Sequence, residues 1–162
     1  MGFTSSAQKI GYIDYQKVSK AHPSYDSILM KLNSFKNEME YKLGQENESF
    51  QIKLKEYQDY LGSSTIDSGV LQAKEKTLIS MKEEFDINQR NASIQYSKME
   101  KDLIDNLNAK INEVVELIAK EKTLIYIIDN SSGLLVVKDP KGDITELVMK
   151  KMGLAIPVKV GE

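Results

Sequence analysis

The residue types that most often do chemistry are scarce in this sequence, and they form no catalytic motif. The chain has no cysteine and a single histidine, His22, which stands beside Pro23 where a helix is expected to begin. We find no HExxH, GxSxG or GxxxxGK[ST] pattern. His22 is therefore interpreted as an exposed linker residue, and we predict no catalytic residue, no cofactor and no enzymatic activity.

Two turn-like motifs and several carboxylate pairs offer only weak binding chemistry. The "DNSSG" motif at Asp129 has the first residues of a calcium loop without the later carboxylates or the closing glutamate, so it predicts a turn and no metal site. The "PKGD" motif at Pro140 likewise predicts a turn. Pairs such as Glu83 and Glu84 alternate with lysines on the expected solvated side of a helix, where charge serves solubility.

Composition narrows the class of protein. The 162 residues include 41% hydrophobic and 28% charged residues, and the net charge is −2. This composition predicts a folded chain, and the slight acidic excess argues against nucleic acid as a partner. The sequence has no apolar run long enough to span a bilayer. The absence of cysteine excludes disulfides but does not separate an exported protein from a cytosolic one.

The first residues carry no recognisable export signal. The stretch "MGFTSSAQK" has neither a cationic start nor an apolar core, although Ala7-Gln8 would suit the position after a cleavage site. We interpret residues 1–8 as a leader, artificial or disordered, that replaces a natural signal peptide. A cytosolic protein with a frayed start is the alternative.

A long helical hairpin fills the middle of the chain. Apolar residues at steps of three, four and seven, from Tyr25 to Leu61, predict one helix that begins near Pro23. The turn-forming stretch 62–69 interrupts the pattern, and a second stripe, in which Leu71, Leu78 and Phe85 recur every seven residues, continues to Ile118. A short turn between two long amphipathic helices makes them antiparallel neighbours, so residues 23–120 are predicted to form an arm with its tip near 62–69.

The apolar stripe of this arm is dilute. Glu46, Asn47, Lys74, Asn88 and Gln95 lie at or beside positions where a tight coiled coil carries leucine or isoleucine. One interpretation is that these polar residues fix the register of the helices. The other is that the hairpin is loose and presents methionine and aromatic side chains to another molecule.

Short β-prone segments flank the arm. Residues 10–14, 124–129 and 134–138 are predicted strands, the last two joined as a hairpin by a turn at "NSSG" and buried on both faces. A terminal helix within "ITELVMKKMG" is expected to stop at Gly153. The predicted class is α+β, with residues 9–22 and 121–154 forming a small β-body and residues 155–162 a tail of unassigned role.

Three segments make the chain resemble the Skp/OmpH family of periplasmic chaperones for outer-membrane proteins. They are "KIGYIDYQKV" from Lys9, "EVVELIAKEKTLIYIIDNS" from Glu113, and "DITELVMKKM" from Asp143. The resemblance implies a homotrimer in which the strands of three chains share one β-body. It also implies a periplasmic holdase that works without ATP and keeps unfolded outer-membrane proteins between its three arms.

The resemblance assigns two sets of residues. The predicted trimer interface consists of Ile10, Tyr12, Ile13, Leu124, Ile125, Tyr126, Ile127, Ile128, Leu135, Val136 and Val137. The predicted client-binding residues on the arm are Phe35, Met39, Phe50, Tyr57, Met81, Phe85, Tyr96 and Met99.

Charge is where this chain departs from the family pattern. Better-known members are strongly basic, whereas residues 24–120 of this chain hold more Asp and Glu than Lys and Arg. Lipopolysaccharide and the membrane surface are therefore doubtful partners, and client capture should rest on apolar contact. The rival interpretation is a structural coiled-coil scaffold or adaptor of the cell envelope that binds one folded partner.

Overall fold

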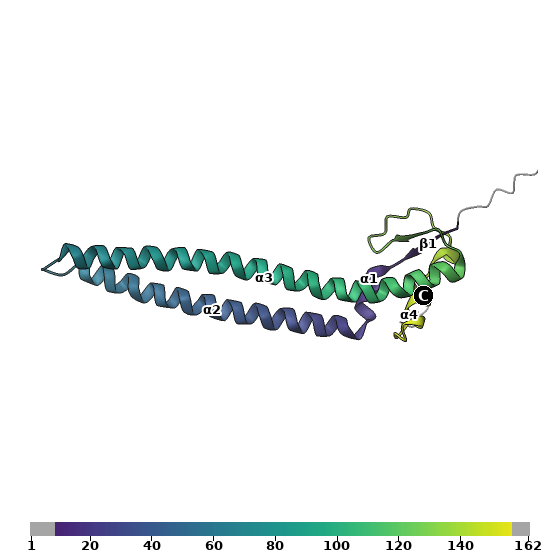
Figure 1. The fold of residues 1–162 in the computed structure, drawn as a ribbon, viewed down its shortest axis with the longest axis horizontal. Helices are drawn as coiled ribbons and strands as arrows, with labels where there is room; N and C mark the ends of the chain where they lie inside the picture. Colours follow the sequence, from purple (N-terminus) through teal and green to yellow (C-terminus); the bar gives the residue numbers. More distant parts are fainter. Residues whose placement is uncertain (1–8, 157–162) are drawn as a thin grey trace, which may run out of the picture. The chain divides into compact units, whose positions relative to one another are not determined.

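The computed structural model describes residues 9–156, so the predicted leader (1–8) and residues 157–162 of the predicted tail lie outside the described residues. The chain divides into two compact units. We call the residues up to Leu29 and from Asp102 onward the body unit, and Met30–Lys101 the hairpin unit. The two long helices α2 (Pro23–Leu61) and α3 (Ser68–Lys122) each contribute to both units, so the division falls inside helices and not at their ends (Figure 1).

The body unit is built around two parallel strands. β1 (Ile10–Ile13) pairs with β2 (Tyr126–Asp129), with Tyr12 opposite Ile128. On the other side of β1, the Ile144 amide donates to the Tyr12 carbonyl at 2.9 Å. Within the described residues, β1 therefore has neighbours on both edges, whereas β2 has one strand neighbour and one free edge.

Local chemistry explains the short elements beside the strands. The Asp14 carboxylate accepts from the Lys17 amide at 2.8 Å and caps α1 (Tyr15–Ala21), and the Asp14 amide donates to Thr145 Oγ1 at 2.9 Å. A short 3₁₀ turn, η1 (Pro140–Gly142), precedes α4 (Thr145–Lys151). Gly153 has a φ of 69° and follows the end of α4 as its stop, as the sequence predicted.

The core of the body unit joins both ends of the sequence to the end of α3. Side chains from β1, α1, the start of α2, the end of α3 and α4 are all buried there, and they are almost entirely aliphatic. The buried residues are Tyr12, Ile13, Val18, Ile28, Leu107, Ile111, Ile118, Ile144, Val148 and Met149. Because α3 supplies three of these residues, its C-terminal end is an integral part of the body unit.

The hairpin unit is an antiparallel pair of helices, as predicted. Residues 62–67 connect α2 to α3, slightly less than the 62–69 turn expected from the sequence. The Asp67 amide donates to Tyr60 Oη at 2.8 Å, and Asp67 Oδ1 accepts from the Gly69 and Val70 amides at 2.7 and 3.0 Å. Asp67 thus caps α3 and fixes the turn between the two helices.

The predicted second strand of the C-terminal hairpin is wrong for the single chain. Residues 134–138 form no strand, and β2 begins at Tyr126 and not at Leu124. The Asn130 side chain accepts from the Leu135 amide at 2.9 Å, which holds the loop in place without a strand ladder. Because the Leu135 amide donates to Asn130, it is not available to pair with β2 in the single chain.

Candidate functional site: apolar surfaces of the body and hairpin units

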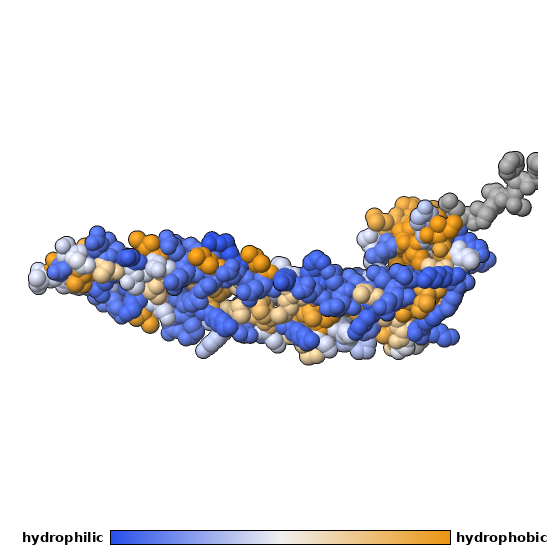
Figure 2. Space-filling view, viewed as in Figure 1, coloured by the Kyte–Doolittle hydropathy of each residue, from blue (hydrophilic) through white to orange (hydrophobic). Residues whose placement is uncertain are grey.

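The body unit presents an apolar surface on β2 and the following loop. Val136, Val137 and Leu134 are 97%, 89% and 74% exposed, and Ile125 and Tyr126 beside them are also exposed. Figure 2 shows hydrophobic side chains gathered over this part of the body unit. Because the free edge of β2 borders the same region, the surface offers both apolar area and unpaired backbone groups.

The residues predicted for a trimer interface divide into three groups by burial. Tyr12 and Ile13 lie in the core of their own chain and have almost no surface to offer a partner. Leu124, Ile127 and Leu135 are half-buried. The exposed members are Ile10, Ile125, Tyr126, Ile128, Val136 and Val137.

The residues predicted to bind clients line the inner side of the hairpin unit. All eight are half-buried, so they pack the two helices together while keeping part of their surface open. Beside Ala92, a hollow of ≈ 370 Å³ is lined by Phe35, Met39, Leu43 and Tyr96. Alanine stands there in the seven-residue series that holds leucine at Leu71 and Leu78, so the hollow follows from the missing side-chain volume.

A second set of apolar residues, missed by the sequence analysis, points away from the helix pair. On α2, Met30, Tyr41 and Ile52 recur every eleven residues and are all exposed. Eleven residues make about three helical turns, so these side chains share one face. On α3 the exposed residues of the hairpin unit include Val70, Ile79, Ile87 and Ile94. The eleven-residue spacing was the signal that could have revealed the α2 set.

The polar residues within the apolar stripe join the two helices. Asn88 Nδ2 donates to Glu46 Oε1 at 2.9 Å, and Tyr57 Oη donates to Glu75 Oε1 at 2.8 Å. The bond to Glu75 is the main cause that raises the pKa of Tyr57, with burial and the carboxylate charge adding to it. These cross-helix bonds favour the interpretation that polar residues fix the register.

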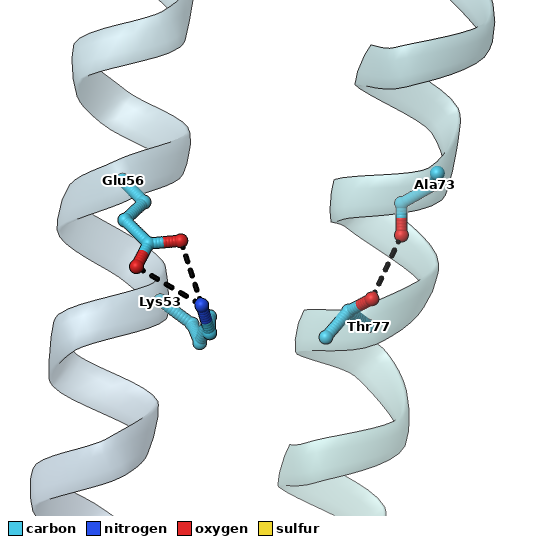
Figure 3. Close-up of polar contacts among 4 residues, drawn as sticks. All are labelled: Lys53, Glu56, Ala73 and Thr77. Atoms are coloured by element: carbon cyan, nitrogen blue, oxygen red, sulfur yellow. Dashed lines mark hydrogen bonds and ion pairs between the residues drawn. The ribbon is translucent and has the colours of Figure 1, made fainter.

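Other polar contacts in the hairpin unit stay within one helix. Figure 3 shows Lys53 Nζ within 2.9 Å of both Glu56 oxygens on α2, and Thr77 Oγ1 donating to the Ala73 carbonyl on α3 at 3.0 Å. The side chains of Lys53 and Glu56 are about half exposed, so solvent screens this pair and it contributes little to stability.

His22 is half-buried and belongs to the start of α2, which corrects its interpretation as an exposed linker residue. Its Nδ1 accepts from the Ser24 amide at 3.1 Å, so the imidazole acts as an N-cap. Burial lowers the pKa of His22, and the nearby Lys110 charge lowers it further. The side chain is therefore a structural acceptor at neutral pH.

The "DNSSG" motif forms a turn, as the sequence predicted. Asp129 Oδ1 accepts from the Ser131 amide at 2.9 Å and from the Tyr15 amide at 3.4 Å, and the Ser131 hydroxyl also donates to it. Burial alone would raise the pKa of Asp129, but these donors hold it below its usual value. The carboxylate is thus committed to protein donors.

No recognisable metal centre or membrane span occurs in the described part of the chain. Residues 9–156 contain no group of three or more His, Cys, Asp or Glu side chains arranged to hold a metal ion. Over the same residues, no helix combines the length and the apolar character needed to cross a bilayer.

Comparison with known proteins identifies the family. Residues 9–152 match the family model described as outer membrane protein (OmpH-like). No curated protein matches the chain. A crystal structure of a candidate outer membrane chaperone (OmpH-like) from Caulobacter crescentus CB15 has the same fold, with a TM-score of 0.73 and 12% sequence identity over 90% of this chain and 83% of that one. The match over nearly the whole described chain shows that this protein belongs to the OmpH-like family.

Proposed function

We propose that the protein is a holdase chaperone of the periplasm that binds unfolded outer-membrane proteins without ATP and prevents their aggregation. Membership of the OmpH-like family supports this class of function. The observation that carries the proposal is the distribution of apolar side chains on the hairpin unit. Single exposed residues such as Tyr41 (69%) and Ile94 (64%) are spread along both helices, and half-buried Met, Phe and Tyr side chains lie between them.

This distribution suits weak contact with many sequences. A partner of one fixed shape is usually bound through a concentrated cluster of large anchors. Scattered isoleucines and adaptable methionines instead give each extended client segment a few apolar contacts wherever it lies. The alternative role, as an adaptor for one folded protein, would require an anchor cluster that the hairpin unit does not offer among its described residues.

The functional form is proposed to be a homotrimer assembled through the body unit. The exposed loop at Val136 and Val137 and the free edge of β2 would be covered by the same segments of two other chains. Covering them would remove both the apolar surface and the open strand edge. Clients would then be held between the hairpin units of the three copies.

The test of this function is an aggregation assay with a urea-unfolded outer-membrane protein diluted into buffer. The chaperone at equimolar trimer concentration should keep the client in solution, with no change on adding ATP. A matched sample of the chaperone with Tyr41, Ile52, Ile87 and Ile94 changed to Ser should hold less client. If the unmodified protein leaves client aggregation unchanged, the proposed function is wrong.

A further inference from the structure

A polar cavity in the body unit lies between β1, the turn that follows β2 and the start of α4. Its volume is ≈ 280 Å³, which is the size of a pocket for one small molecule. The lining side chains come from within residues 12–17, 130–138 and 143–146. The cavity is therefore separate from the hairpin unit, which carries the proposed client contacts.

Two polar side chains of this cavity are about nine-tenths buried, and each keeps one atom without a hydrogen bond. Tyr12 is 7% exposed and Asn130 is 9% exposed. Asn130 Oδ1 accepts from the Leu135 amide at 2.9 Å, whereas Asn130 Nδ2 has no partner among the described residues. The Tyr12 hydroxyl likewise makes no hydrogen bond within residues 9–156. Because buried polar groups are normally hydrogen-bonded, a molecule that enters the cavity must complete these two.

Both atoms can be reached from the cavity. Among the described side chains that are not themselves exposed, Glu46 Oε2 in the hairpin unit is the one polar atom that is fully enclosed and also lacks a partner. Tyr12 Oη and Asn130 Nδ2 lack partners too, so they must keep some contact with the cavity. A molecule in the cavity can therefore hydrogen-bond to both.

The charges around these atoms disfavour a ligand of either sign. Two lysines and three carboxylates share the lining, namely Lys17, Lys138, Asp14, Asp143 and Glu146. Lys138 Nζ lies over the Tyr12 ring, 5.5 Å from its centre, where it would repel a cation. Burial raises the pKa of Tyr12, and the negative charges of Asp143 and Asp139 raise it further, so an anion beside this hydroxyl would also be repelled. A neutral ligand avoids both penalties.

The main chain of a peptide is also a poor fit. Within the described residues, β1 is occupied on both edges, because it pairs with β2 and bridges to Asp143. A client segment therefore finds no open edge of β1 to extend at this cavity. The mainly polar lining also offers little to apolar client side chains.

We propose that this cavity binds one ring of a neutral saccharide. A sugar hydroxyl both donates and accepts hydrogen bonds, so one ring can serve donors and carboxylates together. Asn130 Nδ2 would donate to a substituent of the ring, the Tyr12 hydroxyl would bond to a second, and the Glu146 carboxylate would accept from a third. This binding activity goes beyond the proposed holdase function, because neither the client nor the hairpin unit takes part in it.

An NMR titration of the whole, isotope-labelled protein tests the site. Glucose and N-acetylglucosamine are the probes, and they distinguish a hydroxyl from an acetamido oxygen as the acceptor for Asn130 Nδ2. Inorganic phosphate and choline are the charged comparisons. We expect a dissociation constant on the order of 1 mM for at least one sugar, because the site offers a few hydrogen bonds and no open aromatic face. Amide shifts should be confined to residues 12–17 and 130–146.

Tyr12→Phe removes only the hydroxyl and keeps the buried ring. It should weaken sugar binding about fivefold, which corresponds to the loss of one hydrogen bond. Because this hydroxyl has no partner among the described residues, Y12F should unfold at the parent's temperature. Tyr126→Phe makes the same change on an exposed side chain of β2 and should bind sugar as the parent does. Equal affinities of Y12F and the parent would overturn the proposal.

A second variant keeps the test valid if Y12F loses stability. Asn130→Asp retains the acceptor for the Leu135 amide but replaces the unpartnered donor with an acceptor, so it should also weaken sugar binding. Asn47→Asp makes the same change in charge on the exposed surface of α2 and should have no effect. Saturable shifts at the cavity with phosphate or choline in place of both sugars would overturn the proposal. So would a cavity that responds to none of the four probes, because it would then hold water only.

Discussion

The Tyr15 hydroxyl at the start of α1 donates to the Asn108 carbonyl on α3 at 2.9 Å. Asn112 Oδ1, also on α3, lies 3.0 Å from Tyr15 Oη. Tyr15 and Asn108 are 93 positions apart in sequence. This contact fixes α1 against α3 inside the body unit and ties the N-terminal segment to a helix that begins beyond the hairpin turn.

Tyr15→Phe should destabilise the body unit by about 1–2 kcal/mol, because it removes the hydroxyl and leaves the Asn108 carbonyl without this donor. Chemical denaturation followed by circular dichroism measures the effect. Tyr41→Phe is the control, since the Tyr41 side chain is exposed on α2. Equal midpoints for Y15F and the parent would contradict the prediction.

Two glycines should respond to alanine with opposite signs. A Cβ at Gly11 would lie 2.8 Å from Leu124 Cδ1, the end of a half-buried side chain that can turn aside, so Gly11→Ala should cost about 0.5–1.5 kcal/mol. Gly44 lies within α2 with nothing within 4 Å, so Gly44→Ala should stabilise by about 0.5–1 kcal/mol. Thermal unfolding of the two variants decides the matter, and shifts of the same sign would show that one of the two environments is misjudged.

Stability should fall as the pH drops through the titration of His22. The folded-state pKa is lowered, so the neutral form contributes stability that is fully present above the unfolded value of about 6.5 and is lost as the pH falls towards the folded value. Protonation also turns the Nδ1 acceptor into a donor facing the Ser24 amide.

His22→Asn provides the control for this pH dependence, because asparagine is a good N-cap that does not titrate. His22 is the only histidine in the chain, so the difference in unfolding midpoint between parent and variant isolates its contribution. We expect the difference to change between pH 7.5 and 5. Parallel curves over this range would show that His22 is not coupled to folding.

Assembly should depend on the exposed loop of the body unit. Val136→Asp places a charge where the single chain has no packing to lose, since Val136 is almost fully exposed. If three chains bury this loop together, the charge should cost several kcal/mol per site and separate the trimer. Sedimentation should give trimers for the parent and monomers for V136D, and Ile94→Asp on the hairpin unit should remain trimeric. A monomeric parent at micromolar concentration would exclude the trimer.

Client retention should survive high salt. The screening length falls to about 3 Å at 1 M salt, which weakens exposed ion pairs but not apolar contacts. Replacing Met39, Phe50, Phe85 and Met99 by Ser should weaken holding more than replacing Lys82, Lys98 and Lys101, but these apolar residues also pack α2 against α3. Helicity must therefore be measured alongside retention. Release of client by salt from a fully helical protein would show that capture is electrostatic.

The helical part of the fold could be predicted from sequence because its signals are local. The apolar stripe and the turn-forming residues placed α2, α3 and the connector within a few positions, and Gly153 placed the end of α4. The error at residues 134–138 has a different cause. Strand pairing depends on which edge is available, and in the single chain the Asn130 side chain holds this loop instead.

The candidate site was less predictable, because burial depends on tertiary packing. Tyr12 and Ile13 carry the same β-prone pattern as Ile10, yet only Ile10 is exposed. The unpaired oxygen of Glu46 has no sequence signature at all. Lys42 pairs with Glu38 and not with Glu46, although both carboxylates are four residues from this lysine.

The parallel pairing of β1 with β2 also sets an order of events during synthesis. β1 is made first, but its partner β2 follows only after the whole of α2 and α3 has been made. Local contacts form faster than those between distant residues, so the helical hairpin can form before the sheet exists. Until the last part of the chain is made, Ile10–Ile13 remains an unpaired apolar strand, and the chaperone is for that interval itself an aggregation-prone chain.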